Sequence, residues 1–473
     1  MHHSTIEAHP LTLRRKYHRC LPSDRGHIAF EHRPKSGFPT TILVAAALLT
    51  GCDIPMPGVE HLAPPDWSDA FDAPGNPDGF DTVDTPDTPD IPDEVGNPVR
   101  PPFEISSAGG HTCVLTDYGT VWCWGDNAFD QLGTSNEFEP KPVEITGFGS
   151  PVTALAAGGL HTCAITEAGE IMCWGFNNCG QLGNGTTDGY WIQHNTKPAP
   201  VIGFNGKPVA VSAGHEHTCA LTDTGEVMCW GYNQQGQLGI GTIGHGGDPD
   251  DIGIPVPQQV VGLEPVLRIS AGGDHTCAIT IGHVAKCWGN DGVGAVTGNK
   301  IGEIPFPTLV PGLGSDVKTI SAGGVHTCAM SGFGTVHCWG LIYGFCVPPG
   351  SGLPVAAPIK IPGFESGAIA VSAGWTHTCG VDGNLAVACW GQDDGGALGF
   401  GDPGLYRCMR EALPIGGIAS PVISISTGGF HACALLEGGK VVCWGNNSAG
   451  QLGDGTAEER IGAVEVVGLP ISE

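Results

Sequence analysis

The chain has 473 residues, with 48 acidic against 20 basic side chains and a formal net charge of −28 at pH 7. An acidic surface of this kind repels phosphate, which excludes nucleic acid as an expected partner. The 76 glycines and 38 prolines, beside 41% hydrophobic residues, favour many short strands joined by turns, so we expect an all-β fold.

Residues 38–52, FPTTILVAAALLTGC, form an apolar run that is short for a permanent membrane span and follows Arg33 and Lys35. Its last four residues, LTGC, resemble the lipobox of bacterial lipoproteins, in which the signal is cut before a lipidated cysteine. We therefore predict a leader and lipoprotein signal peptide over residues 1–51 and a lipid anchor at Cys52 in a bacterial cell envelope. The alternative is a chance cysteine after an ordinary signal peptide or in a buried strand.

The next segment, residues 52–102, has the composition of a disordered tether. Twelve prolines and twelve acidic residues follow Cys52 up to Pro102, too polar a mixture to form a core. In polyproline II, which has three residues per turn, one edge would carry Asp81, Asp84, Asp87, Asp90 and Asp93. We expect a solvated spacer, and the alternative is an edge that binds cations or a protein.

From residue 103 onward the sequence repeats seven times. Each copy has His-Thr-Cys, or His-Ala-Cys in the last copy, and then a Cys-Trp-Gly triplet whose cysteine lies ten residues after the first. A period of about fifty residues with three or four short β-rich runs is typical of a propeller blade. We predict a seven-bladed β-propeller with four-stranded blades over residues 103–473.

The two cysteines of each copy are placed to pair. Cys219 and Cys229 lie five residues either side of Thr224, near the centre of a predicted hairpin turn. Cα atoms that are directly opposed in a hairpin approach to about 4.5–5.5 Å, within disulfide range. Zinc is the alternative, but a four-coordinate site needs a further ligand per copy, and an exported protein meets an oxidising compartment. The predicted disulfides are Cys113–Cys123, Cys163–Cys173, Cys219–Cys229, Cys277–Cys287, Cys328–Cys338, Cys379–Cys389 and Cys433–Cys443.

Three further cysteines follow copies two, five and six, outside the repeated pair. Cys346 and Cys408 belong to long loops of neighbouring blades, so we predict a possible extra disulfide between them. Cys179 is then the cysteine left as a thiol.

These copies resemble the repeats of the regulator of chromosome condensation family. Units of that family carry Gly-x-x-His-Thr, a hairpin, Trp-Gly and an Asn-x-x-Gly-Gln-Leu-Gly-x-Gly-Thr tail. The tail is clear at residues 177–186, 233–242 and 447–456, whereas copies four and five lose Gln-Leu-Gly and Ala108 replaces a glycine. The resemblance covers residues 103–473 and implies a seven-bladed propeller.

The order of the predicted strands suggests how the ring closes. Each copy after the first is preceded by a Pro-x-x-Val-x-Gly-Leu-like segment, and a spare version, residues 463–469, ends the chain. We predict that this C-terminal strand pairs into the first blade beside Ile105, which would hide two sheet edges.

No motif for catalysis or metal binding emerges from the propeller sequence. The seven repeated histidines are expected to make structural hydrogen bonds, and the seven tryptophans to form blade cores. His215 and His217 could supply two metal ligands, but strand alternation places Glu216 on the opposite face from both. We therefore predict no catalytic residues, no metal and no cofactor.

The predicted function is a monomeric, membrane-anchored binding scaffold that recognises a protein or glycan through loops on one propeller face and touches the membrane through its lipid alone. The alternative is an extracytoplasmic hydrolase or lyase with a site at the central channel. A convergent acid–base cluster at the channel mouth would favour the enzyme, and an apolar or aromatic patch on inserted loops would favour the binder. The expected insertions are Gly189–Ala199, Ile243–Pro257, Leu341–Ala357 and Phe400–Pro414. The second of them contains an acidic stretch at 247–251, which we expect to be a solvated turn, and the alternative is a calcium-binding loop.

Overall fold

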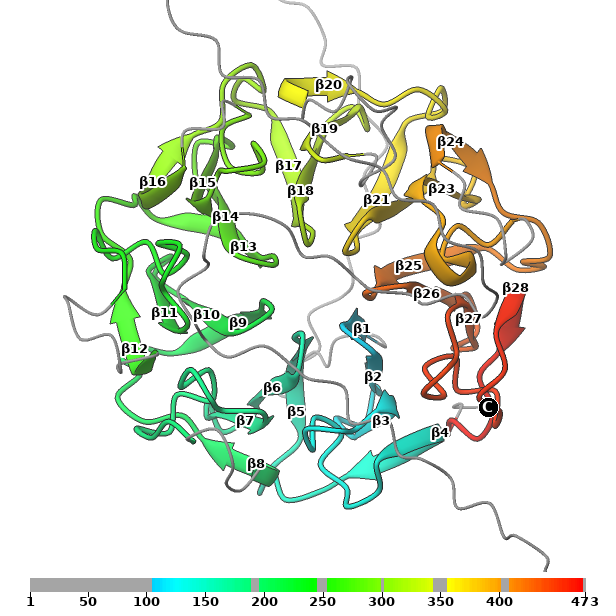
Figure 1. Ribbon diagram of the computed structural model, residues 1–473, viewed down its shortest axis with the longest axis horizontal. Helices are drawn as coiled ribbons and strands as arrows, with labels where there is room; N and C mark the ends of the chain where they lie inside the picture. Colours follow the sequence, from blue (N-terminus) through cyan, green and yellow to red (C-terminus); the bar gives the residue numbers. More distant parts are fainter. Residues whose placement is uncertain are drawn as a thin grey trace, which may run out of the picture. The chain divides into compact units, whose positions relative to one another are not determined.

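The structure is a computed structural model that describes residues 104–188, 195–244, 253–298, 302–342, 355–400 and 408–470. These residues form seven sheets, each of four antiparallel strands in chain order. Figure 1 shows the sheets arranged around a central axis, with the first strand of every sheet innermost. The prediction of an all-β, seven-bladed propeller is confirmed.

The strands of the seven blades have the following bounds. Blade one contains β1 (Glu104–Ala108), β2 (His111–Leu115), β3 (Val121–Asp126) and β4 (Phe138–Ile145). Blade two contains β5 (Val152–Ala157), β6 (His161–Thr166), β7 (Ile171–Gly175) and β8 (Asn195–Pro200). Blade three contains β9 (Pro208–Ala213), β10 (His217–Thr222), β11 (Val227–Gly231) and β12 (Ile254–Gln259). Blade four contains β13 (Val266–Ala271), β14 (His275–Thr280), β15 (Ala285–Asn290) and β16 (Glu303–Leu309).

The remaining blades follow the same plan. Blade five contains β17 (Val317–Ala322), β18 (His326–Ser331), β19 (Val336–Gly340) and β20 (Val355–Lys360). Blade six contains β21 (Ala368–Ala373), β22 (His377–Asp382), β23 (Val387–Gln392), a short 3-10 helix η1 (Asp394–Gly396) and β24 (Cys408–Pro414). Blade seven contains β25 (Val422–Thr427), β26 (His431–Leu436), β27 (Val441–Gly445) and β28 (Arg460–Glu465). Among the described residues, no helix has the length and apolar character needed to cross a bilayer.

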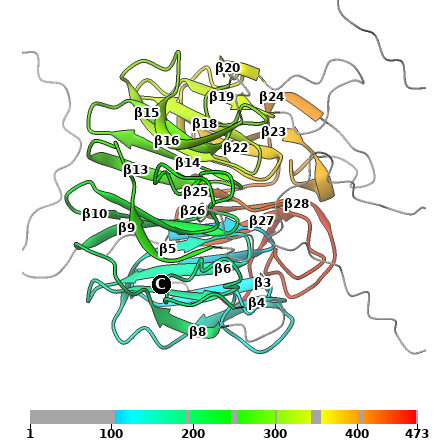
Figure 2. The same cartoon turned by 60° about the vertical axis from the view of Figure 1, so that its left-hand side comes forward.

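The hydrophobic core lies between blades. Figure 2 shows sheets of successive blades packed against one another, and each large core cluster joins residues of two neighbours. The cluster between blades one and two, for example, packs the disulfide of Cys113 and Cys123 against Trp174 of the next blade. All seven repeated tryptophans are fully buried, as predicted for blade core.

The prediction for ring closure is wrong. The last strand, β28, pairs with β27 of its own blade, and β1 pairs with β2 alone. The repeated Pro-x-x-Val-x-Gly-Leu segment contributes the outer strand of the blade before it, so no blade lacks a strand and none is spare. Blades one and seven instead close the ring through a shared core that includes Ile105, Trp124 and Leu435.

The strand directions define two faces of the ring. The first-to-second and third-to-fourth connections of every blade emerge on one edge, which we call the insertion face because all four predicted insertions are third-to-fourth connections. The second-to-third hairpin turns emerge on the other edge, the hairpin face. Glu104, the first residue of β1, and Glu465, the last residue of β28, both lie at the hairpin-face end of their strands.

The structure forms all seven of the predicted ten-residue cysteine pairs. The paired cysteines are directly opposed on the second and third strands, as for Cys219 and Cys229, whose Cα atoms are 4.1 Å apart. Seven buried disulfides indicate an oxidising, extracytoplasmic compartment. Cys179 is also disulfide-bonded, which corrects the expectation of a thiol there. Cys52 and Cys346 lie outside the described residues, as does the side chain of Cys408, so the possible extra disulfide stays a prediction.

Candidate functional site

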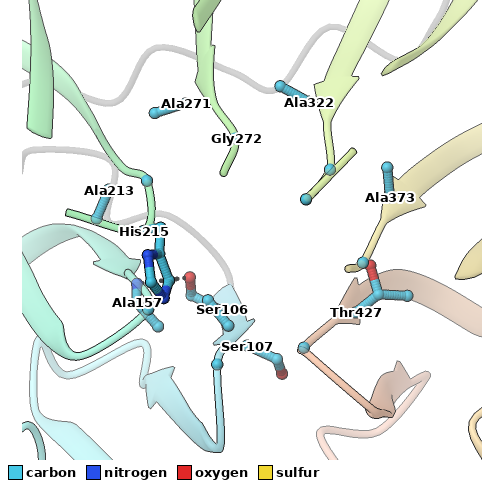
Figure 3. A pocket seen from close by; sticks show the side chains of 18 of the residues that line it. Ser106, Ser107, Ala157, Ala213, His215, Ala271, Gly272, Ala322, Ala373 and Thr427 are labelled. Atoms are coloured by element: carbon cyan, nitrogen blue, oxygen red, sulfur yellow. Dashed lines mark hydrogen bonds between the residues drawn. The ribbon is translucent and has the colours of Figure 1, made fainter. Parts of the chain in front are cut away.

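The innermost strands surround a central channel with a cavity of about 220 Å³. Its walls are made by small residues, such as Ser106, Ala213 and Ala322, because seven strands converge on one axis (Figure 3). A Cβ added at Gly109 would collide with the backbone of Gly159 in the next blade. Glycine is therefore required where adjacent inner turns meet.

The serines of the channel wall have a structural task. The Ser106 hydroxyl accepts a hydrogen bond from the Ala157 amide of the next blade at 2.9 Å. The same bond joins five more neighbouring blades through Ser212, Ser270, Ser321, Ser372 and Ser426. These hydroxyls satisfy amides on the inner strands, which have no further strand to pair with. The six serine hydroxyls are therefore engaged in hydrogen bonds between the blades.

The repeated histidines join the blades in a second ring. In six of them the imidazole Nε2 lies 2.7–2.9 Å from the threonine hydroxyl of the next blade, as between His161 and Thr218. The structural hydrogen-bonding role predicted for these side chains is confirmed at those six positions. His377 is the exception, because the facing residue is Ala432 and neither of its ring nitrogens has a partner. Burial lowers the pKa of His377 to about 4, so its imidazole is neutral.

The insertion-face end of the channel is where the repeat departs from its pattern. After the first glycine of the inner turn, blades two, four, five and seven have a second glycine, at Gly159, Gly273, Gly324 and Gly429. Blades three and six have His215 and Trp375 at that position instead. The imidazole lies over Gly159 and the indole over Gly324, and a Cβ on either glycine would clash with the ring.

The two rings meet. His215 and Trp375 are in edge-to-face contact, with centroids 5.1 Å apart and planes at 71°. They come from blades three and six, which are not neighbours, so they touch across the channel, whose wall both of them line. Figure 3 shows the His215 ring directed into the channel. An aromatic pair therefore bridges one end of the channel.

Two carboxylates and a phenol lie near His215, and none of the three lines the channel cavity. Glu216 follows His215, Asp274 occupies the corresponding position of blade four, and Tyr232 follows β11. Loss of water raises the pKa of both carboxyls, whereas the nearby His215 opposes that rise. Burial and the same two carboxylates raise the pKa of Tyr232. We call His215, Glu216, Tyr232, Asp274 and Trp375 the channel-mouth cluster.

Sequence reasoning placed these residues poorly. It considered His215 and His217 as a pair of metal ligands, but His217 belongs to the histidine–threonine ring. No group of three or more histidine, cysteine or acidic side chains is arranged to hold a metal ion in the described part of the chain. The available signal was the loss of the second glycine at 215 and 375. What it could not show was that the two replacements touch.

The insertion face also carries exposed apolar side chains. Phe138, Ile243 and Phe430 are 43%, 45% and 38% exposed, and Phe129 of blade one packs edge-to-face on Phe176 of blade two. Most of each predicted insertion, including the acidic stretch at 247–251, lies outside the described residues. The described ends of all four insertions nevertheless meet this face.

The chain matches the sequence profile of the RCC1-like domain over residues 79–403 and that of the regulator of chromosome condensation (RCC1) repeat over residues 422–451. It is 32% identical to the human E3 ubiquitin-protein ligase HERC2 over 366 residues, which cover 76% of this chain and 7% of that protein. It is 28% identical to the ultraviolet-B receptor UVR8 of Arabidopsis thaliana, over 78% of this chain and 82% of the receptor.

Solved structures agree on the fold. Prp20p from Saccharomyces cerevisiae superimposes with a TM-score of 0.60 at 25% identity, covering 69% of this chain and 80% of that one. Human WBSCR16 has the same TM-score at 22% identity, covering 70% and 86% of the two chains, which supports the fold alone. The chain thus spans only a small fraction of HERC2, but most of the length of the smaller relatives.

Proposed function

Because the chain belongs to the RCC1-like domain family, we propose that it is an extracytoplasmic binding scaffold, anchored through lipidated Cys52, that takes a protein on its insertion face. A glycan is the alternative ligand. The observation that carries the proposal is that all four insertions and the His215–Trp375 pair lie on this one face, together with exposed apolar side chains such as Phe138.

The path of the chain supports this choice of face. β1 begins and β28 ends at the hairpin-face edge, so the segment that leads back to Cys52 joins the propeller there. The insertion face is the edge opposite to this point of attachment. The seven disulfides suit a scaffold that works outside the cytoplasm, because each restricts the unfolded chain.

An enzyme is the second candidate, favoured by the electrostatic interaction of His215, at the channel mouth, with the buried carboxyls of Glu216 and Asp274. A catalytic base is normally oriented by a hydrogen bond from a third group and aligned with a nucleophile or a bound water. The His215 imidazole makes no hydrogen bond to another described residue, and the serines of the channel wall donate or accept within the fold. Binding therefore fits the cluster better than catalysis.

The test is capture of envelope proteins from the source organism with the full chain carrying Cys52→Ala, which keeps the propeller and removes the anchor. One triple variant alters the insertion face: Phe138→Ser, Ile243→Ser and Phe430→Ser. A matched variant removes three exposed apolar side chains from the hairpin face: Tyr118→Ser, Ile281→Ser and Phe333→Ser.

We expect the insertion-face variant to lose the captured protein and the hairpin-face variant to retain it. If the insertion-face variant retained the captured protein and the hairpin-face variant lost it, the binding surface would lie on the hairpin face and the proposal would be refuted. Turnover of a glycan or peptide by the purified chain, abolished by His215→Gly, would establish the enzyme instead.

A further inference from the structure

The hairpin face has two chemically different parts. Its turns between second and third strands contain acidic residues in blades one, two, three and seven: Asp117, Glu167, Glu170, Asp223, Glu226 and Glu437. The same turns of blades four, five and six contain no acidic residue. They carry exposed apolar side chains instead, namely Ile281, Phe333 and Leu385, of which Phe333 is 89% exposed. Three successive blades therefore present apolar turns without negative charge.

A cavity of about 420 Å³ lies beside the turn of blade five. Its lining comes from three neighbouring blades and includes Arg268 of β13, Lys318 of β17, Phe333 of the turn and Ile369 of β21. All four side chains are exposed to solvent, and no acidic residue is among the described residues that line the cavity. The Phe333 ring and two cationic side chains thus share one depression. We call this cavity and the three apolar turns the apolar sector.

The two bases of this cavity are not neutralised by the fold. In the described part of the chain, Arg268 and Lys318 take part in none of the four ion pairs, and neither side chain makes a hydrogen bond to another residue there. Asp316 and Glu365, in the connections before β17 and β21, are exposed but do not line the cavity. Guanidinium and ammonium groups both bind phosphate, so the cavity offers two cations to an anionic group of that kind.

This combination fits the surface of a phospholipid bilayer. Exposed aromatic and aliphatic side chains enter the boundary between headgroups and acyl chains, and adjacent lysine and arginine side chains are attracted to anionic headgroups. The acidic turns of the other four blades are repelled by the same headgroups, which confines the contact to the apolar sector. The chain that comes from Cys52 also joins the propeller at this face, because β1 begins there at Glu104.

We propose that the apolar sector docks on an anionic phospholipid bilayer, with its turn tips in the interfacial layer and Arg268 and Lys318 on lipid phosphates. This inference rests on the proposed lipid anchor at Cys52 and adds a contact to the expectation that the chain meets the membrane through its lipid alone. Stable attachment needs two signals, so the sector alone holds the chain weakly and reversibly. With the hairpin face on the bilayer, the insertion face, at the opposite edge, points away from it.

The first test asks whether the Phe333 position enters the bilayer. The full chain with Cys52→Ala carries Phe333→Trp in one sample and Tyr118→Trp, in an acidic turn of the same face, in the other. The vesicles contain equal amounts of phosphatidylglycerol and brominated phosphatidylcholine, whose bromine quenches an indole that lies within the bilayer. We expect the fluorescence of Phe333→Trp to fall and that of Tyr118→Trp to match the chain without an added indole. Equal quenching of the two, or quenching of neither, would overturn the inference.

The second test measures the charge contribution by sedimentation with vesicles of phosphatidylcholine and phosphatidylglycerol in equal amounts. Arg268→Gln with Lys318→Gln removes two positive charges from the cavity. Lys207→Gln with Lys440→Gln removes two from elsewhere on the hairpin face. We expect the first pair to weaken the partition onto vesicles about tenfold and the second less than twofold. Equal losses from the two pairs would count against phosphate binding in the cavity and refute the docking mode.

Further outcomes separate this inference from the proposed function. If Cys52→Ala releases the chain from membranes but the vesicles quench neither added indole, the anchor stands and the docking is refuted. If Phe333→Trp is quenched as expected but mass spectrometry of the native chain finds no lipid on Cys52, the docking stands and the anchor fails. If Ile281→Ser with Phe333→Ser abolishes capture of an envelope protein and leaves vesicle binding unchanged, the apolar sector serves a protein partner and the inference is wrong.

Discussion

Replacing Ala432 by threonine should complete the histidine–threonine ring. Six imidazoles reach a threonine hydroxyl of the next blade, while His377 faces an alanine and is left with two unpaired ring nitrogens. The other threonines show that the position has room for the hydroxyl. Thr218, for example, also donates at 2.8 Å to the Gln181 carbonyl, which accepts from Trp230 as well. Ala397 offers the equivalent carbonyl in blade six, where it accepts from Trp444 at 3.1 Å.

The expected gain follows from the burial of both partners. A net intramolecular hydrogen bond contributes about 0.5–1.5 kcal/mol, and relieving an unpaired buried polar group adds to that value. The added side-chain atoms must fit a fully buried site, which opposes the gain. We therefore expect Ala432→Thr to raise the free energy of unfolding by about 1–2 kcal/mol. The assay is urea unfolding at pH 7 with the disulfides intact, followed by tryptophan fluorescence.

Ala432→Val is the matched control, because valine has the shape of threonine without its hydroxyl. It should give no gain, or a loss, since it leaves His377 unpaired. Thr218→Ala opens a second gap in the ring and should lower the free energy of unfolding by about 1–3 kcal/mol. Equal stabilisation by threonine and valine would show that packing, not hydrogen bonding, controls the site, and the reasoning would be refuted.

The remaining predictions concern pH, the disulfides, the anchor and charge. Burial holds the pKa of the seven repeated histidines at about 3 to 4, below their value in the unfolded chain. Because the unfolded chain therefore binds more protons, the free energy of unfolding should fall as the pH drops from about 6.5 toward 4. An unfolding midpoint that is unchanged between pH 7 and 4.5 would contradict this prediction. The pKa of Glu104 is raised to about 7, and burial also raises the pKa of Glu216, Asp274 and Asp394. These carboxyls act in the opposite direction, because protonation relieves a buried charge, but the four of them are outnumbered by the seven histidines. Replacing Cys219 and Cys229 together by alanine should cost about 2–3 kcal/mol, seen as a lower urea midpoint, since the disulfide closes a short loop. Cys52→Ala should move the protein from the membrane fraction to the soluble fraction. If the variant still required detergent for its release, the proposed lipid anchor at Cys52 would be refuted. The propeller, with 12 basic against 33 acidic residues, should not be retained by DNA at neutral pH. Salt-sensitive retention would contradict the expectation that nucleic acid is not a partner.

Much of the fold could be predicted because its determinants are local. The number of blades follows from a repeated pattern, and each disulfide from two cysteines set symmetrically about one hairpin turn, as Cys219 and Cys229 are. The error in ring closure arose because a repeat has no natural first residue. The same segments can be assigned to the start of one blade or the end of the previous one, and only the pairing of β28 with β27 decides between them.

The sequence by itself determined a disulfide-rich propeller with a cluster of variable insertions, because hydrophobic periodicity, turn residues and cysteine spacing act within a single blade. Tertiary structure alone decided which distant residues share the channel mouth. His215 and Trp375 belong to blades three and six, with two blades between them along the chain, yet ring closure brings their side chains into contact across one axis. It also decided that Ala432 leaves His377 without a partner, because that bond forms between blades and not within one.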